Sequence, residues 1–143
     1  MTIYKRAEDI MLRKTFENEI QQVKDDVLLL GSMVEQAILN SVESLRKRDI
    51  KAAHEILNAD ALINKKRFEI ENKLMVLIAT QQPMAHDLRL LASCMEIISE
   101  LERMGDYAEG IAKIIHLHGD QPLVKPLIDI PMMADDVRSM LHR

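Results

Sequence analysis

The segment EIISELERMGDYAEGIAK, residues 96–113, has the apolar spacing of a helix, but its central turn contains residues that disfavour a helix. Two carboxylates, Glu102 and Asp106, lie one helical turn apart, where like charges repel by about 0.2–0.5 kcal/mol. Gly105 stands between them and costs a helix about 1 kcal/mol relative to alanine. Because an ordinary helix would avoid both penalties, this turn is a candidate functional site. Apolar residues recur beside it at the spacing of one buried helix face: Ile98, Leu101, Ala108, Ala112 and Ile115.

The composition indicates a single, soluble, all-α domain. A chain of 143 residues, 48% hydrophobic and 29% charged, is long enough for one core and is not a disordered chain. Four glycines and four prolines provide few of the turn signals that strands need, which favours helices. A net charge of −4, with two Phe and two Tyr, excludes a basic, aromatic surface for nucleic acid.

The cellular location is also constrained by composition. The single cysteine, Cys94, lies on an apolar helix face, which is typical of a core residue in a reducing compartment. The first residues, MTIYKRAED, lack the apolar core of a signal peptide. No apolar run approaches the ~18 residues that a membrane-spanning helix needs. We therefore expect a cytoplasmic protein.

Helical spacing along the chain predicts four helices. The first starts at Phe16 and keeps a heptad-like pattern for about 30 residues, as in a helix packed at a shallow angle. Asp49 is suited to cap the second helix, which should end near Thr80. Pro83 is suited to the first turn of the third helix, which should end by His118. The short connection makes the second and third helices antiparallel.

The predicted fold is therefore an all-α, antiparallel three-helix bundle with a partial fourth helix. Met133 and Val137 in the last segment are spaced like Leu30 and Val34 in the first helix, which indicates the beginning of a second, truncated repeat. Its apolar face needs a partner from another chain, so we expect a homo-oligomer. The expected divisions are a lead-in over 1–14, the bundle over 15–118, a linker over 119–130 and the partial repeat over 131–143.

Polar residues of the second and third helices predict a metal site. In this antiparallel pair, Asp106 should face Asp60 and Glu102 should face Asn64, within about one helical turn. Oxygen donors that converge from two helices favour Mg, Ca, Mn or Fe ions over Zn.

Two other interpretations of the same residues stay open. Arg67 and Arg103 could hold the carboxylates in an ordinary salt-bridge network. A polar row of the second helix either meets the third helix or forms a solvated face. This row contains Asp60, Asn64, Arg67 and Glu71.

Other catalytic and metal-binding patterns are missing from the sequence. No Glu is followed three residues later by His, as a ferritin-like di-iron bundle requires. His116 and His118 end a helix, where positive charge is favourable, and His54 and His86 stand alone. No glycine-rich phosphate loop, serine nucleophile elbow or Cys–His pair is present.

Four segments are specific in combination: LLLGSMVEQAI (28–38), NADALINKKRFEIE (58–71), ATQQPMAHDLRLL (79–91) and ISELERMGDYAEGIAKI (98–114). Together they resemble the first repeat of the PhoU family of bacterial regulators of phosphate uptake. The resemblance covers about residues 15–141. Because PhoU proteins contain two tandem three-helix bundles, it implies that the fourth helix opens a second bundle.

The resemblance also implies a function and a set of site residues. The acidic motif that holds metal clusters in some PhoU proteins falls on Glu102 and Asp106, with Asp60 on the second helix and Asp87 in the DLR segment. PhoU proteins are non-enzymatic and repress phosphate-starvation genes through the ATPase of the phosphate transporter and a sensor histidine kinase. The expected protein is therefore a regulator that is peripheral to membrane complexes. The alternatives are a metal-dependent enzyme or metal store and a plain coiled-coil scaffold.

Overall fold

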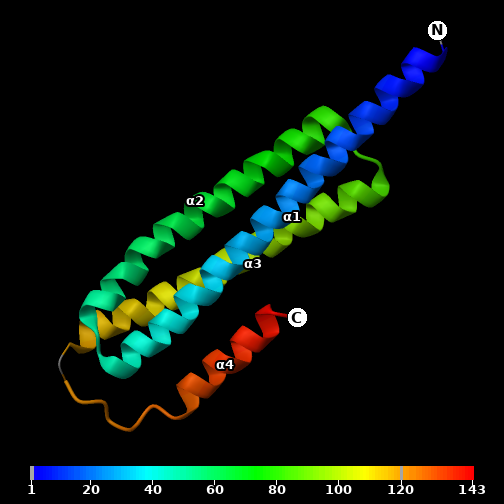
Figure 1. The fold of residues 1–143 in the computed structure, drawn as a ribbon. Helices are drawn as coiled ribbons and strands as arrows, with labels where there is room; N and C mark the ends of the chain where they lie inside the picture. The colour runs from blue at the N-terminus through cyan, green and yellow to red at the C-terminus, as the bar shows by residue number, and fades with distance from the viewer. Residues whose placement is uncertain (1, 120) are drawn as a thin grey trace.

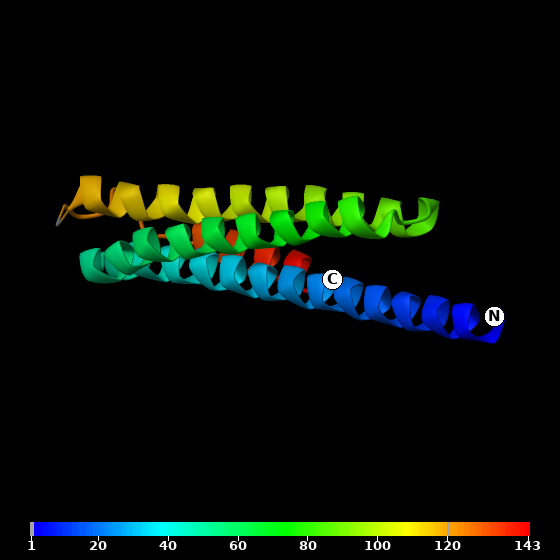
Figure 2. The same ribbon diagram turned by 90° about the horizontal axis from the view of Figure 1, so that it is seen from above.

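The computed structural model describes residues 2–119 and 121–143, with side chains from residue 11 onward except residue 12. Three long helices lie side by side in an elongated bundle, and a short fourth helix lies along the first (Figures 1 and 2). This arrangement confirms the predicted all-α bundle. The helices are α1 (Thr2–Lys47), α2 (Ile50–Gln81), α3 (Ala85–His118) and α4 (Asp129–Leu141).

Helix α1 begins far earlier than the apolar pattern predicts. It is helical from Thr2 rather than from Phe16, and its first turns project past the end of the bundle (Figure 1). No glycine or proline precedes Gly31, so no helix-breaking residue prevents the helix from extending N-terminal to its apolar stripe. The start from Phe16 was wrong because the apolar stripe marks the packed part of a helix and not its length.

The residues at the helix ends determine where the long helices begin and end. The side chain of Asp49 accepts a hydrogen bond from the backbone N–H of Ala52 at 3.0 Å, so the predicted cap of α2 is confirmed. Gln82 takes a left-handed conformation with φ 45° after the end of α2. Met84 is extended and caps α3 at Ala85, so α3 starts two residues after the predicted Pro83. The end of α3 at His118 agrees with the sequence.

The core lies along the axis of the three long helices. Its fully buried side chains include Leu30, Ile63, Leu74, Leu91 and Ile98, each at most 1% exposed. Because each long helix contributes to this cluster, removing any one of them would expose the core. A smaller apolar cluster lies near the start of α2 and the end of α3 and contains Ala53, Ile56, Ala112 and Ile115.

Helix α4 is the least buried helix. Within the described part of the chain it packs against α1 alone. Ala134 is its one buried side chain among those described, and Leu141 packs against the main core. Met132, Met133 and Met140 are each 63% exposed on its outer side. None of the described helices has an apolar stretch long enough to cross a membrane.

Candidate functional site

The interrupted turn of α3 is the place where α3 approaches α2 closely. Gly105 is buried, and a Cβ atom at this position would lie 3.3 Å from Cγ2 of Ile63 and 4.0 Å from Oδ1 of Asp60. Ile63 is itself 1% exposed and belongs to the main core. A glycine therefore allows a contact that a larger residue would crowd. The facing of this turn and Asp60 agrees with the antiparallel register that the sequence predicts.

Asp60 of α2 is the polar residue that lies nearest to this contact. Its Oδ2 accepts a hydrogen bond from Nδ2 of Asn64 at 2.9 Å. Oδ1 of Asp60 and Oδ1 of Asn64 are both buried and have no hydrogen-bond partner. Buried polar atoms without partners are rare because their desolvation is not compensated. This pair is therefore an energetic weak point of the bundle.

The electrostatic surroundings of Asp60 are acidic. Burial raises the pKa of the Asp60 carboxyl, and the carboxylates of Glu109 and Asp106 raise it further. Lys113 lowers this pKa but is outweighed. We refer to Asp60, Asn64, Asp106 and Glu109 as the Asp60 cluster. The cluster combines two unpartnered oxygen atoms of α2 with carboxylates of α3, the helix packed against it.

Glu102 is engaged in an ion pair rather than in the Asp60 cluster. Nε of Arg67 donates a hydrogen bond to Oε2 of Glu102 at 2.9 Å, and the same guanidinium pairs with Glu71. These carboxylates raise the pKa of Arg67. Arg103 pairs with Glu100 instead. The salt-bridge interpretation is thus correct for Arg67 and wrong for Arg103, and the polar row of α2 does meet α3.

Asp87, the remaining predicted metal ligand, lies elsewhere. It occupies the first turn of α3, as the sequence predicts, and is half-buried. At 1.5 Å per residue it lies roughly 28 Å before Asp106 along the helix. The structure therefore brings together Asp60 and Asp106 but leaves Asp87 at the other end of the bundle.

The Asp60 cluster fits a hard cation in donor type and charge. All of its donor atoms are oxygens, and two of them lack any partner. A bound cation would compensate both the unpartnered oxygens and the acidic surroundings. In the described ranges, however, no three His, Cys, Asp or Glu side chains are arranged so that they could hold a metal ion. The cluster supplies ligands whose side chains would have to move to coordinate one ion.

Two other contacts between helices are not predicted from the sequence. Asp26 of α1 accepts hydrogen bonds from Lys66 and Lys73 of α2. Its spacing from Val23 and Leu30 places it at the edge of the buried face, which is the signal that could have identified it. His54 does not stand alone, because its ring lies against the ring of His116 on α3.

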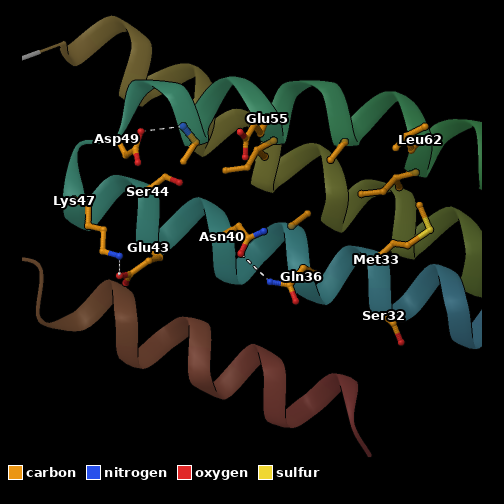
Figure 3. Close-up of a pocket in the computed structure, with 15 residues that line it drawn as sticks. Ser32, Met33, Gln36, Asn40, Glu43, Ser44, Lys47, Asp49, Glu55 and Leu62 are labelled. Carbon is orange, nitrogen blue, oxygen red and sulfur yellow. Dashed lines mark hydrogen bonds and ion pairs between the residues drawn. The ribbon is translucent and has the colours of Figure 1, made fainter.

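A groove of about 700 Å³ runs between α1 and α2 (Figure 3). Apolar side chains such as Met33, Ala37 and Ile63 line it together with polar ones. Gln36 donates a hydrogen bond to Asn40 at 2.8 Å, and Lys47 pairs with Glu43 at 3.0 Å. Helix α4 lies on the other side of α1 from this groove (Figure 3). The groove is therefore an open surface at which both apolar and polar side chains are available for contacts with another molecule.

The sequence matches the PhoU domain over residues 27–115, which is more than half of the chain. The chain belongs to the PhoU family. It is 40% identical over 135 residues to the phosphate-specific transport system accessory protein PhoU homolog of Clostridium acetobutylicum, covering 92% of this chain and 60% of that protein. It is 35% identical over 124 residues to the PhoU homolog of Aquifex aeolicus, covering 87% of this chain and 56% of that protein.

A solved PhoU structure shares the fold. The phosphate transport system regulatory protein PhoU from Streptococcus pneumoniae superimposes with a TM-score of 0.80 at 31% identity. The similarity covers 89% of this chain and 59% of that chain. The chain thus spans a little over half the length of the PhoU proteins that it matches.

Proposed function

We propose that this chain is a non-enzymatic accessory regulator of phosphate uptake that acts in the cytoplasm. The observation that carries the proposal is its similarity to proteins named as accessory proteins of the phosphate-specific transport system. We expect its partners to be the ATPase subunit of the phosphate transporter and a sensor histidine kinase. Through them it would be peripheral to membrane complexes and would repress phosphate-starvation genes when phosphate is plentiful.

The groove between α1 and α2 supports action through protein contacts. It has apolar side chains between polar edges, and Leu62 on its rim is 59% exposed. Grooves of this kind receive the apolar face of an amphipathic helix. We therefore place a partner contact in this groove.

A matched pair of variants tests both the regulatory role and the groove. Ala59 lines the groove and is half-buried, whereas Ala61 is exposed on the same helix outside the groove. In bacteria that lack their own PhoU, the wild type and Ala61→Arg should repress alkaline phosphatase at high phosphate. Ala59→Arg should repress less and bind the transporter ATPase at least about tenfold more weakly, because the arginine fills the groove.

Each outcome of this experiment has a separate meaning. Failure of the wild-type chain to repress contradicts the regulatory role itself. Repression by Ala59→Arg at the wild-type level contradicts only the partner contact in the groove. Circular dichroism of the purified variants checks that both remain helical.

A second candidate function is regulation by a bound cation, which the unpartnered oxygen of Asp60 favours. Asp60, Asn64, Asp106 and, once released from Arg67, Glu102 would hold an Fe, Mg, Mn or Ca ion. The ion would neutralise the acidic surface that a partner meets. Asp87 is too far away to share this ion.

Metal content measured by mass spectrometry tests this candidate. Protein purified without a metal column should contain metal that is missing from Asp60→Asn and from the Glu102→Gln, Asp106→Asn double variant. Equal metal content in all three proteins contradicts the site. A metal-dependent turnover that is lost in Glu102→Ala would instead indicate an enzyme. Unchanged metal content and unchanged partner binding in the double variant would indicate a plain scaffold.

The exposed methionines of α4 support a homo-oligomer. Met133 and Met140 lie on the outer side of the helix, where flexible side chains adapt to a facing surface. The wild type should therefore sediment as an oligomer, and Met133→Glu with Met140→Glu should give monomers. A wild-type monomer at micromolar concentration contradicts this proposal.

A further inference from the structure

Two histidines from different helices lie ring to ring at one end of the bundle. The ring centroids of His54 on α2 and His116 on α3 are 6.2 Å apart, and the ring planes make an angle of 86°. Both side chains are exposed. With Leu57, Lys113 and Leu117 they line a hollow of about 450 Å³. Two imidazoles thus line one open hollow.

The separation of the rings is close to that of two imidazoles bound to one ion. With metal–nitrogen bonds of about 2.0–2.1 Å, two ring centroids that share a tetrahedral ion are about 5 Å apart, and they are further apart at wider angles. The observed distance exceeds the tetrahedral value by about 1 Å, which a rotation of exposed side chains between staggered rotamers can close. A single ion can therefore reach both rings without a movement of the helices.

The backbone positions of the two histidines are fixed by packing. His54 and His116 directly follow Ala53 and Ile115, which are buried in the smaller apolar cluster between α2 and α3. This packing fixes the distance between the two backbones. Lys113, the cation that lines the hollow, forms an ion pair with Glu109 at 2.5 Å, which draws its ammonium group toward that carboxylate. The Glu109 carboxylate therefore offsets the positive charge beside the two rings.

We propose that His54 and His116 form a cross-helix chelate for one divalent transition-metal ion of the Cu²⁺, Ni²⁺ or Zn²⁺ class. Neutral imidazole nitrogens suit these ions, whereas the oxygen donors of the Asp60 cluster suit harder ions. Water completes the coordination shell, because the site has two protein ligands. The site is thus chemically distinct from the Asp60 cluster and does not depend on the proposed function.

The ion would fasten the end of the bundle from which the linker to α4 departs. Helix α2 begins and α3 ends there, and the chain then runs on to α4 (Figure 1). An ion that binds only when both helices are in place stabilises the folded state by mass action. Metal binding would therefore restrict fraying of the last turn of α3 next to the linker.

Titration of the purified full chain with Ni²⁺ and with Cu²⁺ in a non-coordinating buffer tests the site. The variants are His54→Gln and His116→Gln, and the matched control is His86→Gln, an exposed histidine in the first turn of α3. We expect one equivalent bound by the wild type and by the control. Each of the other variants should bind at least about tenfold more weakly, because one of two direct ligands is lost.

Electron paramagnetic resonance of the Cu²⁺ complex provides a second measurement. It should show nitrogen couplings from two imidazoles in the wild type and from one in His54→Gln. Asp60→Asn should leave the Ni²⁺ affinity unchanged. Wild-type affinity in both His54→Gln and His116→Gln overturns the proposal, as does binding that is lost in Asp60→Asn instead. Because both histidines are exposed, circular dichroism should show unchanged helix content in every variant.

Discussion

Two partly buried carboxylates, Asp26 and Asp60, lie between helices in opposite electrostatic surroundings. Burial raises the pKa of Asp26, but hydrogen bonds from Lys66 and Lys73 outweigh burial, and the pKa is lowered. Asp60 is also desolvated but faces other carboxylates, and its pKa is raised. One carboxylate is compensated within the chain and joins two helices. The negative charge of the other, Asp60, is not compensated by the surrounding side chains, so Asp60 is the better candidate for binding a cation.

The two sites also make opposite contributions to the pH dependence of stability. Because the folded pKa of Asp26 is depressed, its contribution is present above the unfolded value of about 3.9 and is lost as the pH falls through the folded pKa. Because the folded pKa of Asp60 is raised, its cost is absent below about 3.9 and complete above its folded pKa. Variants can therefore separate the two sites by pH as well as by position.

The largest effect is expected from Asp26→Asn. The substitution leaves Lys66, whose side chain is 18% exposed, without its anion. We expect the free energy of unfolding at pH 7 to fall by about 2–3 kcal/mol, with a smaller loss near pH 3. Urea denaturation at both pH values measures the free energy of unfolding. Asp25→Asn, at an exposed neighbouring position, is the control and should change stability by less than about 0.5 kcal/mol. Equal effects of the two variants would contradict the role of Asp26.

The substitution Asp60→Asn should raise the free energy of unfolding rather than lower it. The new amide removes the uncompensated charge and can donate a hydrogen bond to the unpartnered Oδ1 of Asn64. In EDTA at pH 7 the free energy of unfolding should rise by about 1 kcal/mol. The gain should disappear near pH 3, where Asp60 is protonated in both states. A loss of stability at pH 7 would show that Asp60 is already compensated.

The ion pair between Arg67 and Glu102 should contribute less. Its side chains are 25% and 28% exposed, so solvent screens the pair in part. A double-mutant cycle with Arg67→Gln and Glu102→Gln should give a coupling of about 0.5–1 kcal/mol. If Glu102 also binds metal, Arg67→Gln should strengthen metal binding because it frees the carboxylate. A coupling near zero would mean that the pair does not hold α2 against α3.

An effect of similar size concerns the close approach of α2 and α3. At Gly110 a Cβ would meet no atom within 4 Å, so Gly110→Ala should stabilise the helix by about 0.5–1 kcal/mol. Gly105→Ala gains the same propensity but crowds buried Ile63 at 3.3 Å, so it should stabilise less or destabilise. Thermal unfolding of both variants gives the comparison. An equal gain at both positions would contradict the tight contact beside Asp60.

The local features of the fold could be predicted from single residues. Asp49 predicted the cap of α2 because a cap acts on backbone groups within its own turn. The short connection before α3 placed Asp60 opposite Asp106 because it leaves little freedom in the register of two antiparallel helices. The same connection did not predict the exact start of α3, which Met84 sets by its extended backbone.

The sequence by itself determined the helices and the antiparallel register of α2 and α3, because helical spacing, caps and breakers act over a few residues. Only the tertiary structure decided which charges pair. The approach of Lys66 and Lys73 to Asp26 and of His116 to His54 depends on how each helix is rotated and on the rotamers that packing permits. The choice of Arg67, rather than Arg103, as the partner of Glu102 has the same origin. These pairings are set by the packing of whole helices, and no local pattern encodes the partner of each side chain.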